Sequence, residues 1–298
     1  MSECAETKPK QTEISRMSRD LATFTFVRHG ESTDNLRSVW AGWADSTLTN
    51  HAQAVAAALS ATQFTAILSS PLKRAYMTAQ EVHKQQVGSP PLSTSPMLRE
   101  RHFGVAEGKP STSKTDPNIS LAEHYKRGVY PALPSRKQKF PEGESLDEVQ
   151  DRARQVWADV LLHYVRQAAS DEYHGQVHVV VVSHGIFIKE ALRALVKYDS
   201  TVDTTLCDSQ WLRNTGWARV VIGIKGDEPI SSQDSLPPLR VQLTHFNQCD
   251  HLTSVKRQRG GIGRESYDAR QKDIRRFFDE GRKAKSFRET QSEGKSKQ

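Results

Sequence analysis

The chain has 298 residues, enough to bury a substantial core as one large domain or two small ones. Only 36% of its residues are hydrophobic and its mean hydropathy is −0.65, so we expect part of it to stay unfolded. Its three scattered cysteines, Cys4, Cys207 and Cys249, argue against a disulfide framework and against a cysteine-based metal site. Without an apolar leader or a run long enough to cross a bilayer, the sequence predicts a soluble protein of the cytoplasm or nucleus.

The net charge of +7 comes from one end of the chain. Residues 255–298 contain 14 Lys and Arg against 7 Asp and Glu, whereas residues 1–254 carry 28 of each sign. The body of the protein is therefore neutral overall, and its charge gives no reason to expect a polyanionic partner such as nucleic acid.

Apolar runs, taken in chain order, predict the strands of the core. They lie at residues 22–28, 64–70, 177–184 and 216–224, and an alternating run at 239–247 predicts a later or edge strand. The third run, VHVVVVSH, is almost continuously apolar, so we expect it inside a sheet that is covered on both faces.

Segments between these runs predict helices at residues 50–60, 72–86, 146–168 and 186–196. Thr49 is the expected N-cap of the first, and Ser145 with Glu148 predicts a capping box at the start of the third. Strands that alternate with helices at this spacing predict an α/β fold, with a mostly parallel sheet between layers of helices.

Other regions break this pattern. Residues 109–140 are rich in Pro, Ser and Lys and form an insertion within a single domain that spans residues 21–254. Long insertions in a compact domain are more often functional than idle. Residues 1–20 and 255–298 are polar enough to be disordered.

Basic and imidazole side chains follow three of the predicted strands. Arg28 and His29 end the first, Arg74 follows the second, and His184 ends the third. Because the carboxyl ends of parallel strands meet at one edge of a sheet, we expect these four side chains to converge there.

The chemistry of these residues suits a phosphoryl group. Arg28 and Arg74 offer planar, permanently charged forks that match phosphate oxygens. Such cations lower the pKa of a nearby imidazole, so His29 would be neutral and able to attack phosphorus, while Gly30 lets the backbone approach the anion closely.

Two further groups complete this predicted site. A protonated His184 would stabilise the charge that accumulates on the phosphoryl oxygens during transfer. Glu100, in the segment LRERHFGVAEG, is the candidate general acid for the departing oxygen and later the base that activates water.

Five segments occur along the chain in an order typical of one protein family: VRHGESTDN, SSPLKRAYMTA, LRERHFGVAEGK, FPEGESLDEV and VVVVSHG. Together they resemble the histidine phosphatase superfamily, which includes the cofactor-dependent phosphoglycerate mutases, over about residues 22–247. Within it, LRERHFGVAEGK followed by GES is most similar to the TIGAR-type fructose-2,6-bisphosphatases.

This resemblance implies a three-layer α/β/α sandwich and a phosphatase that works through a phosphohistidine at His29. No metal and no cofactor are expected, and the expected substrate is a small phosphorylated metabolite, with a sugar bisphosphate preferred. The implied phosphate and substrate pocket contains Arg28, His29, Asn35, Arg74, His184 and Gly185, with Glu100 as the proton donor.

Two alternative functions stay open. The segment AGWADSTLT is closer to the mutases than to the phosphatases, so a cofactor-dependent phosphoglycerate mutase is the first alternative. The second is an interaction scaffold that has lost its enzyme activity. It ranks lower because all five expected catalytic residues are present: Arg28, His29, Arg74, Glu100 and His184.

The insertion and three further histidines allow more than one interpretation. The insertion is either a solvated loop or a lid whose Lys126 and Arg127 help hold a second phosphate of the substrate. His102 either lines the pocket or caps a turn. His174 and His178 are expected at the solvated surface and not as metal ligands, because a loop followed by a strand does not put residues four apart on one face.

The C-terminal tail carries a separate pattern. QKDIRRFF, residues 271–278, places Gln271, Ile274, Phe277 and Phe278 at the spacing of a sliding-clamp (PCNA) interaction motif, a disordered segment that anchors in a groove. One alternative is that these apolar side chains dock on the protein's own body. Another is that the runs KRQR and GRKAK form a nuclear-localisation or nucleic-acid-binding arm.

Overall fold

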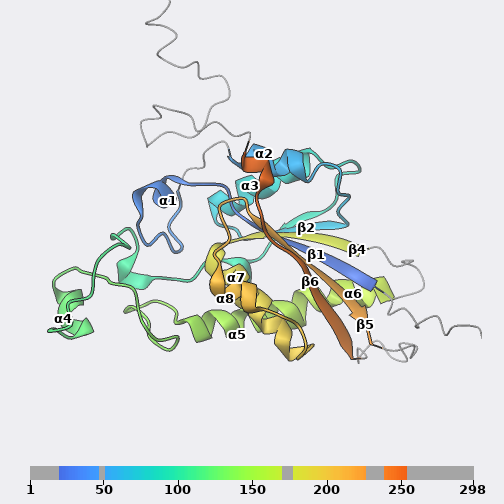
Figure 1. The fold of residues 1–298 in the computed structure, drawn as a ribbon. Coiled ribbons are helices and arrows are strands. Elements are labelled where there is room, and N and C mark those ends of the chain that lie inside the picture. The colour runs from blue at the N-terminus through green and yellow to red at the C-terminus, as the bar shows by residue number, and fades with distance from the viewer. Residues whose placement is uncertain (1–19, 47–50, 170–176, 226–237, 254–298) are drawn as a thin grey trace, which may run out of the picture.

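A single six-stranded sheet forms the centre of the molecule, in the strand order β3-β2-β4-β1-β5-β6 (Figure 1). The computed structural model describes residues 20–46, 51–169, 177–225 and 238–253. The strands are β1 (Asp20–Arg28), β2 (Ala66–Ser69), β3 (Leu92–Thr94), β4 (Val177–Ser183), β5 (Trp217–Ile224) and β6 (Leu239–Gln248).

The strand directions confirm a mostly parallel sheet. β3, β2, β4 and β1 run parallel to one another, and β5 is antiparallel to both of its neighbours, β1 and β6. In the register of the central strands, Arg28 lies opposite Ser183 and Ser69 lies opposite Val182. Three segments far apart in the sequence therefore end at the same edge of the sheet.

Helices cover both faces of this sheet and make a three-layer α/β/α sandwich, as expected. In Figure 1, α2 and α3 lie on one side of the strands and α5, α6 and α7 on the other. The helices are α1 (Thr33–Arg37), α2 (His51–Ala58), α3 (Lys73–Lys84), α4 (Leu121–Lys126), α5 (Leu146–Val156), α6 (Leu162–Ala169), α7 (Gly185–Ala194) and α8 (Thr205–Ser209).

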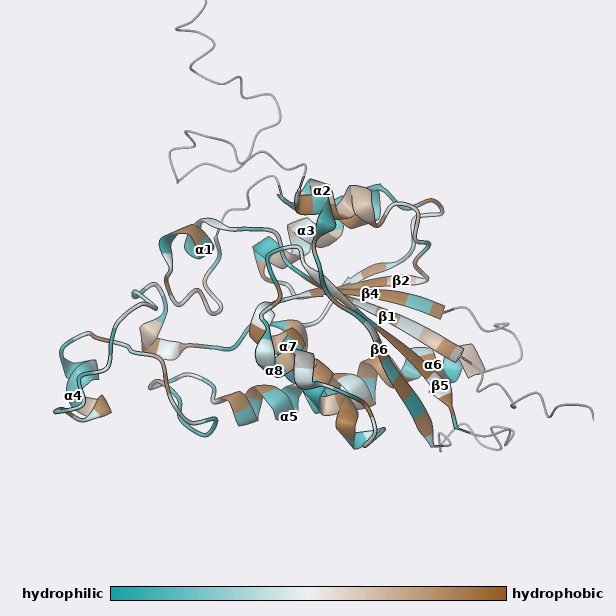
Figure 2. Ribbon diagram, in the orientation of Figure 1, coloured by the Kyte–Doolittle hydropathy of each residue, from teal (hydrophilic) through white to brown (hydrophobic). Residues whose placement is uncertain are grey.

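The valine run of β4 is buried on both faces because successive side chains of a strand point to opposite sides. Val180 and Val182 pack in the cluster beneath α2 and α3, while Val179 and Val181 pack in the larger cluster on the other face. In Figure 2 the central strands are largely hydrophobic, whereas α5 mixes hydrophilic and hydrophobic residues. Each face of the sheet thus has its own hydrophobic core.

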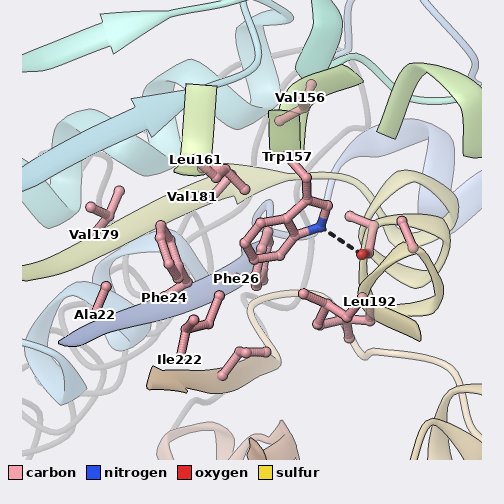
Figure 3. Packing of buried hydrophobic residues seen from close by; sticks show 14 of the residues in the cluster. Ala22, Phe24, Phe26, Val156, Trp157, Leu161, Val179, Val181, Leu192 and Ile222 are labelled. Atoms are coloured by element: carbon pink, nitrogen blue, oxygen red, sulfur yellow. Dashed lines mark hydrogen bonds between the residues drawn. The ribbon is translucent and has the colours of Figure 1, made fainter. Parts of the chain in front are cut away.

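Trp157 is the largest fully buried side chain of the larger cluster. Its ring lies 5.3 Å from that of Phe24 and 5.8 Å from that of Phe26, measured between centroids (Figure 3). Its indole N–H donates a 2.8 Å hydrogen bond to the carbonyl of Ala191 in α7 (Figure 3). This bond satisfies the polar atom of a buried indole and connects α7 to the turn that follows α5.

The third predicted helix and the strand β3 differ from the sequence prediction, which also lacks the short helices α1, α4 and α8. The helix predicted over 146–168 consists of α5 and α6 joined by one π-helical turn at Trp157–Leu161, and its capping box between Ser145 and Glu148 is present. The strand β3 was not predicted, because its three residues are not buried and carry no apolar run. It forms by pairing with β2, which a local pattern cannot indicate.

The 109–140 insertion is ordered by its own packing. Tyr130 and Phe140 are buried in a third cluster, against which Tyr125 and Trp40 pack. In Figure 1 its helix α4 lies at the periphery, well away from the sheet. Part of the insertion is therefore packed against the domain, while much of it is exposed.

Several predictions fall on parts of the chain outside the described residues. They include the N-terminal segment 1–20 apart from Asp20, the tail 255–298 and its clamp-binding motif of Gln271, Ile274, Phe277 and Phe278. Among the helices that are described, none is long and apolar enough to cross a membrane.

Candidate active site

Two buried histidines meet at the carboxyl edge of the sheet. His29 follows the last residue of β1, and His184 follows the last residue of β4 and precedes α7. Their ring centroids lie 5.0 Å apart, and both residues are at most 3% exposed. Because β1 and β4 are parallel neighbours in register, two residues 155 positions apart reach one point.

The hydrogen bonds of His29 define its protonation. Its Nδ1 lies 2.7 Å from the carbonyl oxygen of Gly30, so Nδ1 carries the proton. Its Nε2 accepts a 3.3 Å hydrogen bond from Nε of Arg74. Burial and the charges of Arg74 and Arg28 hold the pKa of His29 well below its usual range. The imidazole is therefore neutral, with an unprotonated Nε2 in the site.

His184 is also neutral in the free protein, whereas the expected protonation of His184 concerns the phosphoryl-transfer step. Burial, followed by the charge of Arg74 and the neighbouring His29, lowers its pKa well below the usual range. Its Nε2 lies 2.8 Å from Oγ of Ser70, and its buried Nδ1 has no partner among the described residues. An arriving phosphate dianion would oppose these positive charges and favour protonation of His184.

Two guanidinium groups flank the histidines. Arg74, 1% exposed, donates from Nη1 to the carbonyl of Ala44 at 2.7 Å and from Nη2 to the carbonyl of Gly42 at 2.6 Å. Arg28 donates from Nη1 to the carbonyl of Leu212 at 2.6 Å. Its buried Nε has no partner in the part of the chain that is described. Unpartnered buried donors are rare, and beside His29 one is suited to an oxygen of a bound anion.

The carboxylate of Glu100 lies at the N-terminus of α7. Its two oxygens accept hydrogen bonds from the backbone N–H groups of Ile186 at 3.3 Å and Phe187 at 3.2 Å. Arg152 of α5 holds the segment that carries it, donating to the carbonyls of Met97 and Arg99, both at 2.8 Å. Glu100 is thus fixed at the rim of the same site by a helix terminus and a buried arginine.

Asn35 and Gly185 complete the polar side of the site. Oδ1 of Asn35 accepts hydrogen bonds from Ser32 and from Asn214, which leaves its amide nitrogen as the donor for the pocket. At Gly185, an added Cβ would lie 3.4 Å from Nε of Arg28, so the glycine lets the start of α7 approach this guanidinium closely.

A cavity of about 180 Å³ adjoins these residues, and of the two histidines only His29 lines it. Its polar lining consists of Arg28, His29, Asn35, Arg74, Glu100 and Ser111. Its apolar lining includes Val39, Trp40, Phe103, Ile186 and Trp211. The volume fits a phosphoryl group with a few further atoms, so the rest of a ligand would extend toward the apolar side.

Three other residues that the sequence suggested for the pocket lie outside its lining. Lys126 and Arg127 do not line the cavity, and Nε of Arg127 pairs with Glu123 within the exposed helix α4 at 3.0 Å. His102 stacks on Trp43, with 4.5 Å between ring centroids, and is also absent from the lining.

His178 is half-buried, although a solvated position was expected. Its Nε2 accepts a 2.8 Å hydrogen bond from Thr25, and its ring packs edge-on against Phe64. The other histidine of that pair, His174, lies outside the described residues. Among described side chains, no group of three or more His, Cys, Asp or Glu is placed to hold a metal ion.

Several residues of the site escaped sequence reasoning. Ser70 contacts His184, and Thr78 accepts the backbone N–H of Gly30 at 3.0 Å. Both lie in the segment SSPLKRAYMTA, from which the sequence analysis predicted only Arg74 as a site residue. Arg152 and Trp211 carry no local signal at all, because their roles depend on which segments pack against them.

Comparison with known proteins agrees with this geometry. Residues 24–221 match the histidine phosphatase superfamily (branch 1). A probable phosphatase of Schizosaccharomyces pombe, C1620.13, is 31% identical over 90% of this chain and 84% of its own length. Fructose-2,6-bisphosphatase TIGAR B of Danio rerio is 30% identical over 78% of this chain and 96% of its own length.

Mutases and solved structures extend the comparison. A 2,3-bisphosphoglycerate-dependent phosphoglycerate mutase of Brucella anthropi is 31% identical over 72% of this chain and 98% of its own length. The structure of mycobacterial glucosyl-3-phosphoglycerate phosphatase superposes with a TM-score of 0.54 at 24% identity, over 76% of this chain and 99% of that one. The latter likeness concerns the fold alone.

A phosphate-sized pocket with His29 between two arginines, at the carboxyl edge of a mostly parallel sheet, is suited to phosphoryl transfer, and the matched proteins include phosphatases and a phosphoglycerate mutase. The chain belongs to the histidine phosphatase superfamily, over a match that covers most of its described domain. Its enzyme class is that of the phosphoric monoester hydrolases.

Proposed function

We propose that this protein hydrolyses a small phosphorylated metabolite of the sugar-phosphate kind through a phosphohistidine at His29. The observation that carries the proposal is the state of that imidazole. It is neutral, its Nδ1 proton is held by the carbonyl of Gly30, and its Nε2 lies in a buried site between Arg74 and His184. A nucleophile needs this unprotonated nitrogen beside groups that bind the phosphoryl oxygens, and the hydrogen bond from Arg74 is released as Nε2 attacks.

The first step transfers the phosphoryl group to the protein. Nε2 of His29 attacks phosphorus, the N–P bond forms and the P–O bond to the leaving group breaks. Glu100, which carries a proton in the substrate complex, donates this proton to the departing oxygen and becomes a carboxylate. Nε of Arg28, the guanidinium of Arg74 and Nδ1 of His184 stabilise the charge on the phosphoryl oxygens, which is largest in the transition state.

The second step returns the protein to its starting state. Glu100, now a carboxylate, accepts a proton from water as the water oxygen attacks phosphorus and the N–P bond breaks. Inorganic phosphate leaves, and His29 is again neutral because the arginines and its burial hold its pKa low. The substrate class draws support from the D. rerio relative, which is named a fructose-2,6-bisphosphatase, and hydrolysis draws support from the S. pombe relative, which is named a probable phosphatase.

The test compares the wild type with His29→Ala on a panel of phosphorylated metabolites, with and without 2,3-bisphosphoglycerate. We expect wild-type phosphate release that needs no bisphosphoglycerate, and an acid-labile, alkali-stable phosphoenzyme that His29→Ala cannot form. Isomerisation of a phosphoglycerate that depends on the bisphosphate would instead identify a mutase. Equal phosphate release by wild type and His29→Ala would overturn the proposed mechanism.

A further inference from the structure

The pocket has one charged end and one uncharged side. All of its titratable lining residues, Arg28, His29, Arg74 and Glu100, belong to the phosphoryl site described above. Beyond them the described lining is apolar apart from the amide of Asn35, which also belongs to the phosphoryl site, and the hydroxyl of Ser111, which donates to the carbonyl of Ser38. A leaving group in this pocket therefore meets apolar and aromatic surface.

All three guanidinium nitrogens of Arg74 at the phosphoryl site already donate hydrogen bonds within the protein. Arg74 uses Nε on His29 and both terminal nitrogens on backbone carbonyls. Two basic residues of the insertion have other partners, since Arg127 pairs with Glu123 and Arg136 pairs with Glu190. Among the described lining residues, no cation remains for a second phosphate of a substrate.

Trp211 is the most exposed part of the apolar lining. Its side chain is 60% exposed, although large aromatic residues are buried on average. The next residue, Leu212, accepts the hydrogen bond from Arg28, so the indole is anchored beside the phosphoryl site. The ammonium of Lys189 lies 4.6 Å from the ring centroid and covers one face, which leaves the other face for a ligand.

A second indole makes the apolar lining rigid. Trp40 donates from Nε1 to the carbonyl of Tyr130 in the insertion at 2.9 Å, and its ring packs against Phe103 at 4.7 Å between centroids. The insertion thus shapes the substrate side of the pocket through Trp40, whereas its exposed charges lie elsewhere.

Building on the proposed phosphatase activity, we propose that the substrate is a monophosphate ester whose leaving group presents an uncharged ring, a sugar or an aryl group, to the indole of Trp211. A ring that stacks on an indole removes apolar surface of both rings from water, which favours binding. A second phosphate at the same place would lose hydration without gaining a cation. The site therefore favours ring monophosphates over bisphosphates.

The experiment measures kcat and KM for phenyl phosphate, glucose 6-phosphate, fructose 1,6-bisphosphate and 3-phosphoglycerate. For each substrate, kcat and KM of the variant are divided by those of the wild type, and this ratio cancels the intrinsic reactivity of the leaving group. For Trp211→Ala we expect KM to rise about tenfold with the two ring monophosphates and less than about twofold with 3-phosphoglycerate. Trp211→Phe, which keeps an aromatic face, should stay within about threefold of wild type.

Two controls separate stacking from other effects. Val196→Ala also removes exposed apolar surface but lies outside the pocket lining, and we expect it to behave as wild type. Lys189→Gln tests whether the ammonium on the indole recognises a second phosphate, and we expect no selective change in KM for fructose 1,6-bisphosphate.

Three results would overturn the inference. They are an unchanged KM for ring monophosphates in Trp211→Ala, a wild-type kcat/KM that is higher for the bisphosphate than for both ring monophosphates, and a selective loss of the bisphosphate in Lys189→Gln. Each leaves the proposed function intact, because phosphate release still depends on His29. Absence of wild-type activity toward the whole panel would overturn the proposed function as well.

Discussion

Nε of Arg74 donates a hydrogen bond to Nε2 of His29 over 3.3 Å, and both side chains are at most 3% exposed. A guanidinium is always protonated, so it can only donate, and the imidazole nitrogen that faces it must be unprotonated. The contact with Arg74 therefore sets the tautomer of His29 in the free protein.

Replacement of Arg74 by Met should change both rate and pH dependence. It removes a donor for the phosphoryl oxygens, and we expect kcat to fall by about 10²-fold or more. It also removes a charge that lowers the pKa of His29. Because His29 must be neutral to attack, the acidic limb of kcat/KM should move to higher pH than in the wild type.

The matched control is Lys73→Met, which changes the exposed neighbouring residue of the same helix. We expect its pH profile and kcat to equal those of the wild type. If the acidic limb of Arg74→Met stays where it is in the wild type, Arg74 does not set the protonation of His29.

Arg152 should act on catalysis through Glu100. Its guanidinium donates to the carbonyl of Met97 at 2.8 Å, to that of Glu100 at 3.2 Å and to the carboxylate of Glu144 at 2.8 Å. Arg152→Met would release the segment that carries Glu100, and a displacement of about 1 Å can cost about 10²-fold in rate. Alkyl phosphates, which need the general acid, should lose more kcat than 4-nitrophenyl phosphate.

Arg154 provides the control in the same helix, because it is exposed and pairs only with Asp151 within α5. Arg154→Met should leave kcat unchanged with both substrates. An equal loss of kcat by Arg152→Met on alkyl and 4-nitrophenyl phosphates would mean that Arg152 supports the fold and not the position of Glu100.

His178 should make the stability of the fold depend on pH. Burial, and to a smaller extent Arg219, lowers its pKa in the folded protein from 6.5 to about 4. Between these values the unfolded chain binds more protons than the folded protein, so the free energy of unfolding rises with pH from about 4 to 6.5. His29 and His184 act in the same direction, because burial lowers their pKa values too.

His178→Gln removes one of these titrations while its amide oxygen can still accept the hydrogen bond from Thr25. We expect the stability lost between pH 6.5 and pH 4 to be smaller than in the wild type, by up to about 3 kcal/mol. Urea unfolding at a series of pH values gives this slope, and parallel curves for the two proteins would contradict the assignment.

The insertion should be held to α7 by one buried carboxylate. Glu190 is 1% exposed and accepts hydrogen bonds from Arg136 of the insertion at 2.7 Å and from Arg193 at 2.6 Å. Removal of one arginine leaves the other, whereas removal of both leaves a buried charge without a cation. Arg136→Met and Arg193→Met should therefore each cost about 1–2 kcal/mol, and the double variant more than the sum.

Lys139→Met is the control for this pair, since Lys139 makes an exposed ion pair with Glu148 and should have little effect on stability. Denaturant unfolding measures each free energy, and protease sensitivity within residues 109–140 reports on the insertion itself. Strictly additive variants would show that Glu190 does not depend on both arginines together.

The sequence by itself determined the fold class and the chemistry of the site. The apolar runs at 22–28 and 177–184 predicted parallel strands, and these became β1 and β4. Since the ends of neighbouring parallel strands coincide, the convergence of His29 and His184 followed from the order of the elements alone. Local patterns of this kind depend only on the chain's own periodicity and composition.

Only the tertiary structure decided how these groups are protonated and what surrounds them. His184 is neutral in the free protein, because its burial and the charge of Arg74 hold its pKa well below the usual range. The expected lid cations Lys126 and Arg127 lie away from the pocket, while Trp211 and Arg152, which no motif indicated, lie beside it. Desolvation and contacts between distant segments depend on packing, and packing leaves no local signature in a single sequence.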